Sequence, residues 1–212
     1  SPNYFNHDCT CARNVQHAAL SIFGSGRKTF NYDYGNCKHL VLYGRNVFES
    51  LRVKQANIIM DMLDRGGKIT YIDPRAAGTA MKATRYWPIR PGTDYALNLG
   101  IIHTVLRDKL YDGEFVRQWV LGLKELESFV IPYTPEWAAG ETGIPADEIV
   151  EFTHEIAADR PAVIFHPGWM MARYSDSFYS IRTNYIINAL MGAFATPGGL
   201  FFHKGTGDVG AK

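Results

Sequence analysis

A strand–helix–strand pattern between residues 39 and 74 constrains the fold more than any other feature of the sequence. Residues 39–44 form an apolar run that ends at a glycine, which is typical of a buried parallel strand. Apolar residues recur at helical spacing over 48–63, and two glycines then supply a stop signal. Residues 68–74 read as a second strand, closed by a proline. Such a βαβ unit is right-handed and predicts a parallel sheet covered by helices.

The rest of the chain continues this alternation of strands and helices. We expect a strand at 87–89, a helix from Thr93 or Asp94 to about Leu110, helices at about 112–130 and 145–158, a strand at 161–168 and a long helix over 175–194. The predicted fold class is therefore α/β, with a parallel Rossmann-like sheet, helices on both of its faces and an additional helical sub-layer.

These elements suggest four successive segments. They are a lead-in loop and helix over 1–36, a dinucleotide-binding α/β unit over 37–134, a helical connection over 135–160, and a returning strand, long helix and Gly-rich tail over 161–212. The chain opens without Met and ends in a charged, Gly-rich stretch, so we interpret it as an internal segment of a longer polypeptide.

The composition excludes several classes of function. With 46% hydrophobic residues among 212, the chain can bury a substantial core. A formal net charge of +1 indicates no global attraction to nucleic acid or to an anionic membrane. No apolar run reaches the length of a membrane helix, and the first residues resemble no leader. Three cysteines are too few for a disulfide framework.

Two candidate ligand sites follow the first two strands. The turn from Gly44 to Ser50 lies where the carboxyl end of a strand meets a helix, a place suited to phosphate, yet it lacks GxGxxG and the P-loop pattern. It is equally compatible with a simple turn. Asp73 and Arg75 end the next strand, where an acidic residue can bind ribose hydroxyls or a purine edge and an arginine can pair with phosphate. The alternative is a solvated Asp–Arg pair.

Two further candidates lie elsewhere in the chain. Arg90, Gly92 and Asp94 place a guanidinium, a close backbone approach and a carboxylate within five residues, although a capped helix start explains part of this. Near the amino end, a thiolate at Cys9 or Cys11 beside Arg13 would have a lowered pKa, which suits nucleophilic or metal-ligand chemistry. Two cysteines alone do not make a zinc site, and a structural thiol is the alternative.

The order of these motifs resembles a known family. The series is Thr10-Cys11, Tyr43-Gly44-Arg45-Asn46, Ile72-Asp73-Pro74-Arg75, Trp87-Pro88-Ile89-Arg90-Pro91-Gly92-Thr93-Asp94, Asn188-Ala189-Leu190-Met191-Gly192 and Pro197-Gly198-Gly199. It resembles the dimethyl sulfoxide reductase superfamily of molybdenum or tungsten enzymes that carry bis(molybdopterin guanine dinucleotide). Within it, the amino-terminal residues look most like the polysulfide and thiosulfate reductase branch.

The resemblance implies a role for particular residues. Cys11 stands where the family places the protein ligand of the metal, and a soft thiolate suits molybdenum. Gly44, Asn46, Glu49 and Ser50 match a turn that lies along one guanine dinucleotide. Further matches to the guanosine end are Asp73, Arg75, Arg90, Gly92 and Asp94. Gly168, Trp169 and Arg173 occupy a segment that in relatives comes near the pterin and substrate pocket, and His166 ends the strand beside it.

Departures from the family pattern narrow the expectation. Cys11 is followed by Ala12-Arg13, which disfavours a formate dehydrogenase, and Cys9 leaves the ligand assignment ambiguous by two residues. The Cys-rich motif that binds a 4Fe-4S cluster in many relatives is absent from these residues, so we expect such a cluster in a preceding part of the parent chain. The family's carboxyl-terminal β-barrel region is absent as well.

The resulting expectation is a cofactor-binding segment of a molybdenum or tungsten oxidoreductase. Its parent would transfer two electrons and an oxygen or sulfur atom to or from a small inorganic substrate such as polysulfide or thiosulfate. Arg13 or Arg173 would steer an oxyanion. The resemblance also implies an iron–sulfur subunit and a membrane anchor subunit, outside the cytoplasmic membrane. The rivals are a stand-alone nucleotide-binding module and an inactive fragment without cofactor.

Overall fold

A four-stranded parallel sheet forms the centre of the molecule. The computed structural model describes residues 13–24, 30–50 and 53–202. The sheet contains β2 (His39–Tyr43), β3 (Lys68–Ile72), β4 (Arg85–Trp87) and β5 (Val163–Pro167) in the order β4-β3-β2-β5. Every residue of β2 and β5 is buried, as expected for parallel strands that are covered on both faces. The predicted parallel α/β fold is confirmed.

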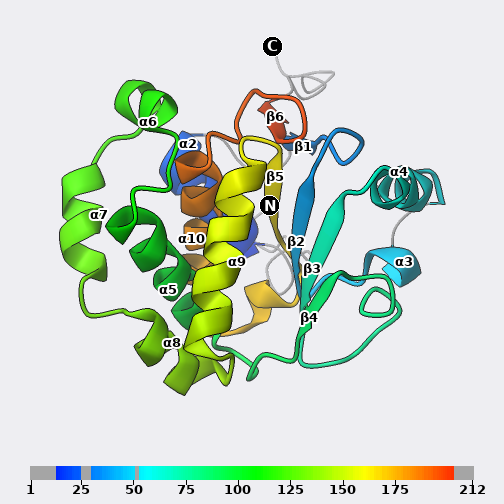
Figure 1. Ribbon diagram of the computed structural model, residues 1–212, viewed down its shortest axis with the longest axis horizontal. Helices are drawn as coiled ribbons and strands as arrows, with labels where there is room; N and C mark the ends of the chain where they lie inside the picture. Colours follow the sequence, from blue (N-terminus) through cyan, green and yellow to red (C-terminus); the bar gives the residue numbers. More distant parts are fainter. Residues whose placement is uncertain (1–12, 25–29, 51–52, 203–212) are drawn as a thin grey trace, which may run out of the picture.

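Helices cover both faces of this sheet (Figure 1). On one side lie α3 (Val47–Ser50) and α4 (Val53–Asp64), and on the other lie α5 (Asp94–Arg107), α9 (Ala146–Asp159) and α10 (Ser177–Leu190). Helix α2 (Arg13–Phe23) packs against α10. The outer helices α6 (Gly113–Trp119), α7 (Leu123–Val130) and α8 (Pro135–Thr142) form the predicted additional layer beyond α5.

Three of the predicted elements differ from the structure. The single helix expected over 112–130 is wrong, because Val120 is extended and Gly122 adopts a left-handed conformation that begins α7 instead of continuing α6. The helix expected over 48–63 is two helices, α3 and α4, on either side of residues 51–52, which lie outside the described residues. The strand expected at 87–89 ends at Trp87, where Pro88 has no N–H to continue the ladder.

A second, two-stranded sheet was not predicted. Strand β1 (Phe30–Tyr32) pairs antiparallel with β6 (Leu200–Phe202), about 170 positions later in the chain. Three-residue strands give almost no periodic signal, so their partners cannot be read from sequence. Rings of Phe23, Phe30, Phe194 and Phe202 pack together beside this pair. This cluster ties the two ends of the described chain to each other.

Side chains from the helices hold the central strands in place. The amide of Asn188 on α10 accepts a hydrogen bond from the backbone N–H of Phe165 and donates to its carbonyl oxygen, both at 2.9 Å. It therefore satisfies the open edge of β5 as a neighbouring strand would. The hydroxyl of Tyr43, the last residue of β2, donates to Asn98 on α5 at 2.6 Å. These bonds position the carboxyl ends of both strands.

None of the helices among the described residues has the length and apolar character needed to cross a lipid bilayer.

Candidate functional site

The carboxyl ends of β2 and β3 open into a crevice of about 480 Å³. The loop that follows β4 and the turn that contains η2 (Met171–Arg173) form its other walls. Six of the residues predicted to bind the cofactor line it, namely Gly44, Asn46, Asp73, Arg75, Gly92 and Asp94. Open parallel sheets bind ligands at this edge, because the connections diverge there. The structure thus brings together residues that lie up to fifty positions apart in the sequence.

Two glycines shape the walls of this crevice. Gly44 and Gly92 have φ values of +54° and +82°, which disfavour any residue with a Cβ. A Cβ on Gly44 would lie 2.9 Å from Cβ of Met170, and one on Gly92 would lie 3.3 Å from the ring of Tyr174. Both positions therefore need glycine, because of backbone conformation and because the turn with η2 approaches so closely.

The Asp73 carboxylate is oriented by its own loop. One oxygen accepts from the backbone N–H of Arg75 at 2.8 Å, and the other accepts from the hydroxyl of Tyr71 at 2.8 Å. Each carboxylate oxygen can accept more than one hydrogen bond, so both retain capacity for a ligand. The Arg75 guanidinium is largely exposed and lies 3.6 Å from Glu49. Such an exposed pair contributes little to stability and can exchange partners.

Asp94 carries the most perturbed carboxyl of the crevice. It is only 7% exposed, and no ion pair with another described residue neutralises it. Burial raises its pKa from 3.8 to about 6, an effect that the nearby Asp73 charge increases and a backbone hydrogen bond opposes. A buried carboxyl with a raised pKa that lines a crevice is a common mark of a functional site.

Other predicted residues brace the crevice from behind. The side-chain oxygen of Asn46 accepts from the backbone N–H and hydroxyl of Thr79 at 3.3 and 2.7 Å. Glu49 accepts from the backbone N–H of Gly78 at 2.9 Å, and Ser50 donates to the carbonyl oxygen of Asn46. Glu49 and Ser50 lie outside the crevice lining. Their positions indicate a role in holding the loop over 76–83 against α3.

The remaining predicted residues do not line the crevice. Arg90 donates to the carbonyl oxygens of Gly140 and Glu141 at 3.0 and 2.6 Å, so its guanidinium covers the end of α8. Gly168 is buried, and a Cβ there would lie 1.8 Å from the carbonyl oxygen of Tyr43. Trp169 and Arg173 are exposed next to it, and Arg13 is exposed at the start of α2. Cys9 and Cys11 lie outside the described residues.

Sequence reasoning missed several residues that line the crevice. Tyr71, Ile89, Met170, Met171 and Tyr174 contribute apolar and aromatic surface to it. The last three belong to the turn after β5, which comes to the crevice from the opposite end of the sequence. Tyr71 was detectable as a strand residue two positions before Asp73, whereas no local pattern marks the turn.

Arg45 and His166 form a second polar pair near the same edge of the sheet. Arg45 Nε and His166 Nδ1 are buried and have no hydrogen-bond partner within the described part of the chain. Burial lowers the pKa of His166 well below its usual value, and the Arg45 charge adds to this. The imidazole packs 4.3 Å from the Tyr32 ring.

No group of three or more His, Cys, Asp or Glu side chains suited to a metal ion occurs among residues 13–24, 30–50 and 53–202.

Two curated proteins are similar to this chain over more than nine tenths of its length. The thiosulfate reductase molybdopterin-containing subunit PhsA of Salmonella typhimurium is 34% identical over 204 residues, which are 96% of this chain and 26% of PhsA. Acetylene hydratase of Syntrophotalea acetylenica is 33% identical over 197 residues, 92% of this chain and 26% of that protein. The chain thus spans about a quarter of the length of these relatives.

A solved structure extends the likeness to the fold. Acetylene hydratase from Pelobacter acetylenicus superposes with a TM-score of 0.85 at 30% identity, over 95% of this chain and 27% of that one. A model of the family described as molybdopterin oxidoreductase matches residues 1–211, almost the whole sequence. This chain belongs to the molybdopterin oxidoreductase family.

Proposed function

We propose that this chain forms part of the cofactor site of a molybdenum or tungsten oxidoreductase and holds the guanosine end of a molybdopterin guanine dinucleotide in the crevice. The family implies a molybdopterin, and the guanine dinucleotide form is our proposal. The observation that carries it is the meeting of Asp73 and Asp94 in one crevice of about 480 Å³. That volume falls within the range of about 300–1,000 Å³ usual for small-molecule and cofactor sites.

The residues of the crevice fit a nucleotide in their chemistry. Guanine presents two adjacent N–H donors on one edge, and a carboxylate can accept both. Ribose hydroxyls also donate to carboxylates. The Arg75 guanidinium lies beside the same crevice and can pair with phosphate in bidentate geometry. Gly44 and Gly92 allow the turn with Met170 and Tyr174 to close one wall of the crevice.

The reaction of the parent enzyme is a separate part of the proposal. A molybdenum or tungsten centre held by pterin dithiolene sulfurs supplies two-electron redox chemistry when bound. We place the metal ligand at Cys11, which lies outside the described residues. Arg173 is exposed, and its guanidinium forms no hydrogen bond or ion pair with another described residue, so it is available to pair with an oxyanion such as thiosulfate. Arg13 is the other candidate for that role.

The partners that we propose for the parent enzyme rest on its similarity to PhsA. PhsA is named as a molybdopterin-containing subunit, which supports a multi-subunit parent. We propose an iron–sulfur electron-transfer subunit, a membrane anchor subunit and a 4Fe-4S cluster in the parent catalytic chain. Iron and labile-sulfide analysis of the purified parent tests the cluster, and a parent without iron would contradict it.

Acetylene hydratase favours a second candidate function. Its name describes the addition of water, not a redox reaction, and it matches this chain about as well as PhsA does. Assays of the intact parent with thiosulfate, polysulfide and acetylene separate the two candidates. Turnover of a sulfur compound with a reduced dye would support the oxidoreductase, and acetylene hydration alone would favour the hydratase.

The cofactor proposal is tested by the nucleotide content of the intact parent enzyme. Acid hydrolysis of a bound guanine dinucleotide releases GMP, which can be quantified beside molybdenum and tungsten. We expect Asp73→Asn and Asp94→Asn to lower both contents several-fold, since each removes a charged acceptor. The control is Asp61→Asn, an exposed carboxylate on α4.

Two outcomes would contradict the proposal. One is a parent enzyme that yields no GMP or yields another nucleotide. The other is wild-type GMP and metal content in both crevice variants, with folding verified by circular dichroism. If the parent enzyme contains metal and GMP but the isolated 212-residue chain does not, the isolated chain is an inactive fragment and the proposal for the parent stands. Binding of free GMP without pterin or metal in the parent would favour the stand-alone nucleotide module.

A further inference from the structure

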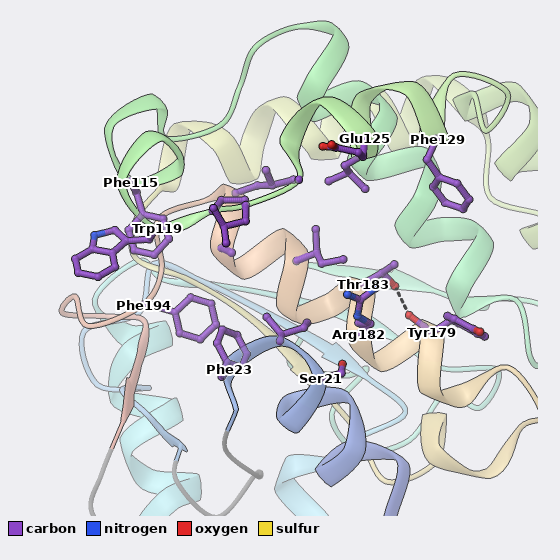
Figure 2. Close-up of a pocket in the computed structure, with 18 of the residues that line it drawn as sticks. Ser21, Phe23, Phe115, Trp119, Glu125, Phe129, Tyr179, Arg182, Thr183 and Phe194 are labelled. Atoms are coloured by element: carbon purple, nitrogen blue, oxygen red, sulfur yellow. Dashed lines mark hydrogen bonds between the residues drawn. The ribbon is translucent and has the colours of Figure 1, made fainter.

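A second cavity, of about 1070 Å³, lies between α2, α5, α10 and the arm formed by α6 and α7. Figure 2 shows Phe115 and Trp119 from α6 and Glu125 and Phe129 from α7 on one wall, facing α2 and α10 on the other. No residue that lines the nucleotide crevice lines this cavity. The cavity opens to solvent, and most of its lining is apolar. Contact of such a surface with water is unfavourable, so an apolar occupant would stabilise it.

The apolar surface of the cavity continues outward onto the arm. Leu121 is 99% exposed and Trp119 is 72% exposed, and both line the cavity. Ile131, directly after α7, is 68% exposed beyond its lining. A small molecule inside the cavity would leave Ile131 in water. A polypeptide segment laid along the arm would cover Ile131 as well, so the extent of the apolar surface favours a protein occupant.

The cavity wall also carries a cation, Arg182, that forms no ion pair with any of the residues the structure describes. Arg182 on α10 lines it, and its Nε atom is buried without a hydrogen-bond partner in the described ranges. Glu125 also lines the cavity, but no ion pair joins it to Arg182. In Figure 2 the two side chains lie on opposite walls. A buried N–H without an acceptor is unfavourable, and an occupant with an acidic side chain would supply a charged acceptor to Arg182, so such an occupant is favoured.

The comparison with relatives identifies the source of the occupant. PhsA aligns with this chain over only 26% of its own length, so about three quarters of such a protein lies outside the matched region. We propose that an apolar segment from that remainder of the parent polypeptide fills the cavity, covers Trp119 and Leu121, and places a carboxylate against Arg182. The cavity is thus an internal packing surface of the parent, separate from its cofactor site.

Photo-crosslinking in the intact parent enzyme tests the source. A photoreactive phenylalanine analogue at position 121 replaces a side chain that contacts nothing essential to the fold, because Leu121 is 99% exposed. We expect its crosslinked peptide to come from the same polypeptide, outside these 212 residues. The control position is Met81, which is 88% exposed and remote from the cavity lining. The same analogue at Met81 should give no such crosslink in comparable yield.

Any other crosslinking result overturns the proposal. A peptide from another subunit or from a second copy of the parent would identify a different occupant. A peptide from within the 212 residues, or no crosslink above the Met81 control, would mean that no outside segment covers the arm.

The charge of Arg182 is tested by surface labelling of Trp119 in the parent. Hydroxyl radicals should modify Trp119 several-fold faster in Arg182→Glu than in the wild type, because a carboxylate would repel the acidic side chain of the occupant. Arg182→Lys keeps the charge and should remain close to the wild type. Equal labelling of Trp119 in all three proteins would show that Arg182 does not help to hold the occupant. If Trp119 of the wild type is labelled as fast as the exposed Met81, no segment covers Trp119 and the whole proposal is overturned.

Discussion

The two ends of the same parallel sheet use charged residues in opposite ways. At the amino ends, Lys68 lies 3.0 Å from Glu155 and 3.1 Å from Asp159, and Arg85 lies 2.7 Å from Glu155. His39 shares a 2.8 Å hydrogen bond with Thr70 and lies 3.4 Å from Asp159. At the carboxyl ends, Asp94 is buried without an ion pair to a described residue, and Arg75 has only a distant, exposed partner.

This difference separates structural charges from functional ones. At the amino ends, the neighbouring His39 lowers the pKa of Asp159, against the opposing effect of burial, and Lys68 adds to the lowering. Lys68 and the carboxylates of Glu155 and Asp159 stabilise one another in their charged forms. Burial has the contrary effect on Asp94 and raises its pKa to about 6. Burial makes the charged form of Asp94 unfavourable, so a role in ligand binding explains this residue better than a role in stability does.

The largest effect is expected at the carboxyl ends, from Gly168→Ala. The added Cβ would lie 1.8 Å from the Tyr43 carbonyl oxygen, so β2 and the turn after β5 must separate. We expect a loss of about 3 kcal/mol in the free energy of unfolding, measured by urea titration of the chain. Gly140→Ala in α8 is the control, because its Cβ would meet nothing within 4 Å and should stabilise the helix by about 0.5–1 kcal/mol. Equal effects would show that the close approach is not needed.

The next effect is the pH dependence caused by Asp94. Its pKa is higher in the folded chain, so the folded state binds the proton more tightly and its contribution to stability falls as pH rises from about 4 to about 6. Asp94→Asn should remove this slope and stabilise the ligand-free chain at pH 7 by about 1–2 kcal/mol. The whole pKa shift of Asp94 corresponds to roughly 3 kcal/mol. The expected stabilisation is smaller, because the amide of the variant is still a buried polar group.

The measurement is the difference between wild-type and Asp94→Asn unfolding free energies across pH 4–7, which cancels the contributions of other carboxyls. Asp61→Asn should leave the curve unchanged. A variant that is less stable than the wild type at pH 7 would show that the Asp94 charge stabilises the fold, and the contrast between the two ends of the sheet would fail.

A smaller effect is expected at the amino ends, from Arg85→Met. The guanidinium lies over the rings of Trp87 and Phe152 at 5.6 and 5.5 Å and pairs with Glu155. Its loss should cost about 1 kcal/mol in urea titration, since the pairs are partly solvated and Glu155 keeps Lys68. The GMP content of the parent enzyme should be unchanged. A loss of GMP comparable with that in Asp73→Asn would contradict a purely structural role for this cluster, and exposed Lys82→Met serves as the control.

The smallest effect is expected from Arg90→Met. Because its hydrogen bonds to the end of α8 are exposed to solvent, their loss should cost about 0.5 kcal/mol or less in urea titration. The resemblance assigns Arg90 to the nucleotide, whereas its position assigns it to α8. GMP content in the parent decides between them: wild-type content favours the helix-capping role, and a several-fold loss favours the nucleotide.

Several parts of the candidate site could be predicted because they follow strands. Gly44 and Asp73 come directly after apolar runs, and parallel strands bring their carboxyl ends to one edge. Gly92 and Asp94 follow the next strand, so the same rule places them nearby. The turn with Met170 and Tyr174 could not be predicted, since it reaches the crevice only because β5 pairs with β2 across about 120 positions.

The sequence by itself determined the parallel α/β class, the succession of its main strands and helices along the chain and the position of the crevice, since apolar runs and glycines are local signals of strands and of their ends. Only the tertiary structure decided which charges are paired. Arg90 and Asp94 lie four positions apart, yet one extends to α8 and the other is buried at the crevice. Partner choice depends on where side chains meet in space, and sequence spacing does not specify that across loops.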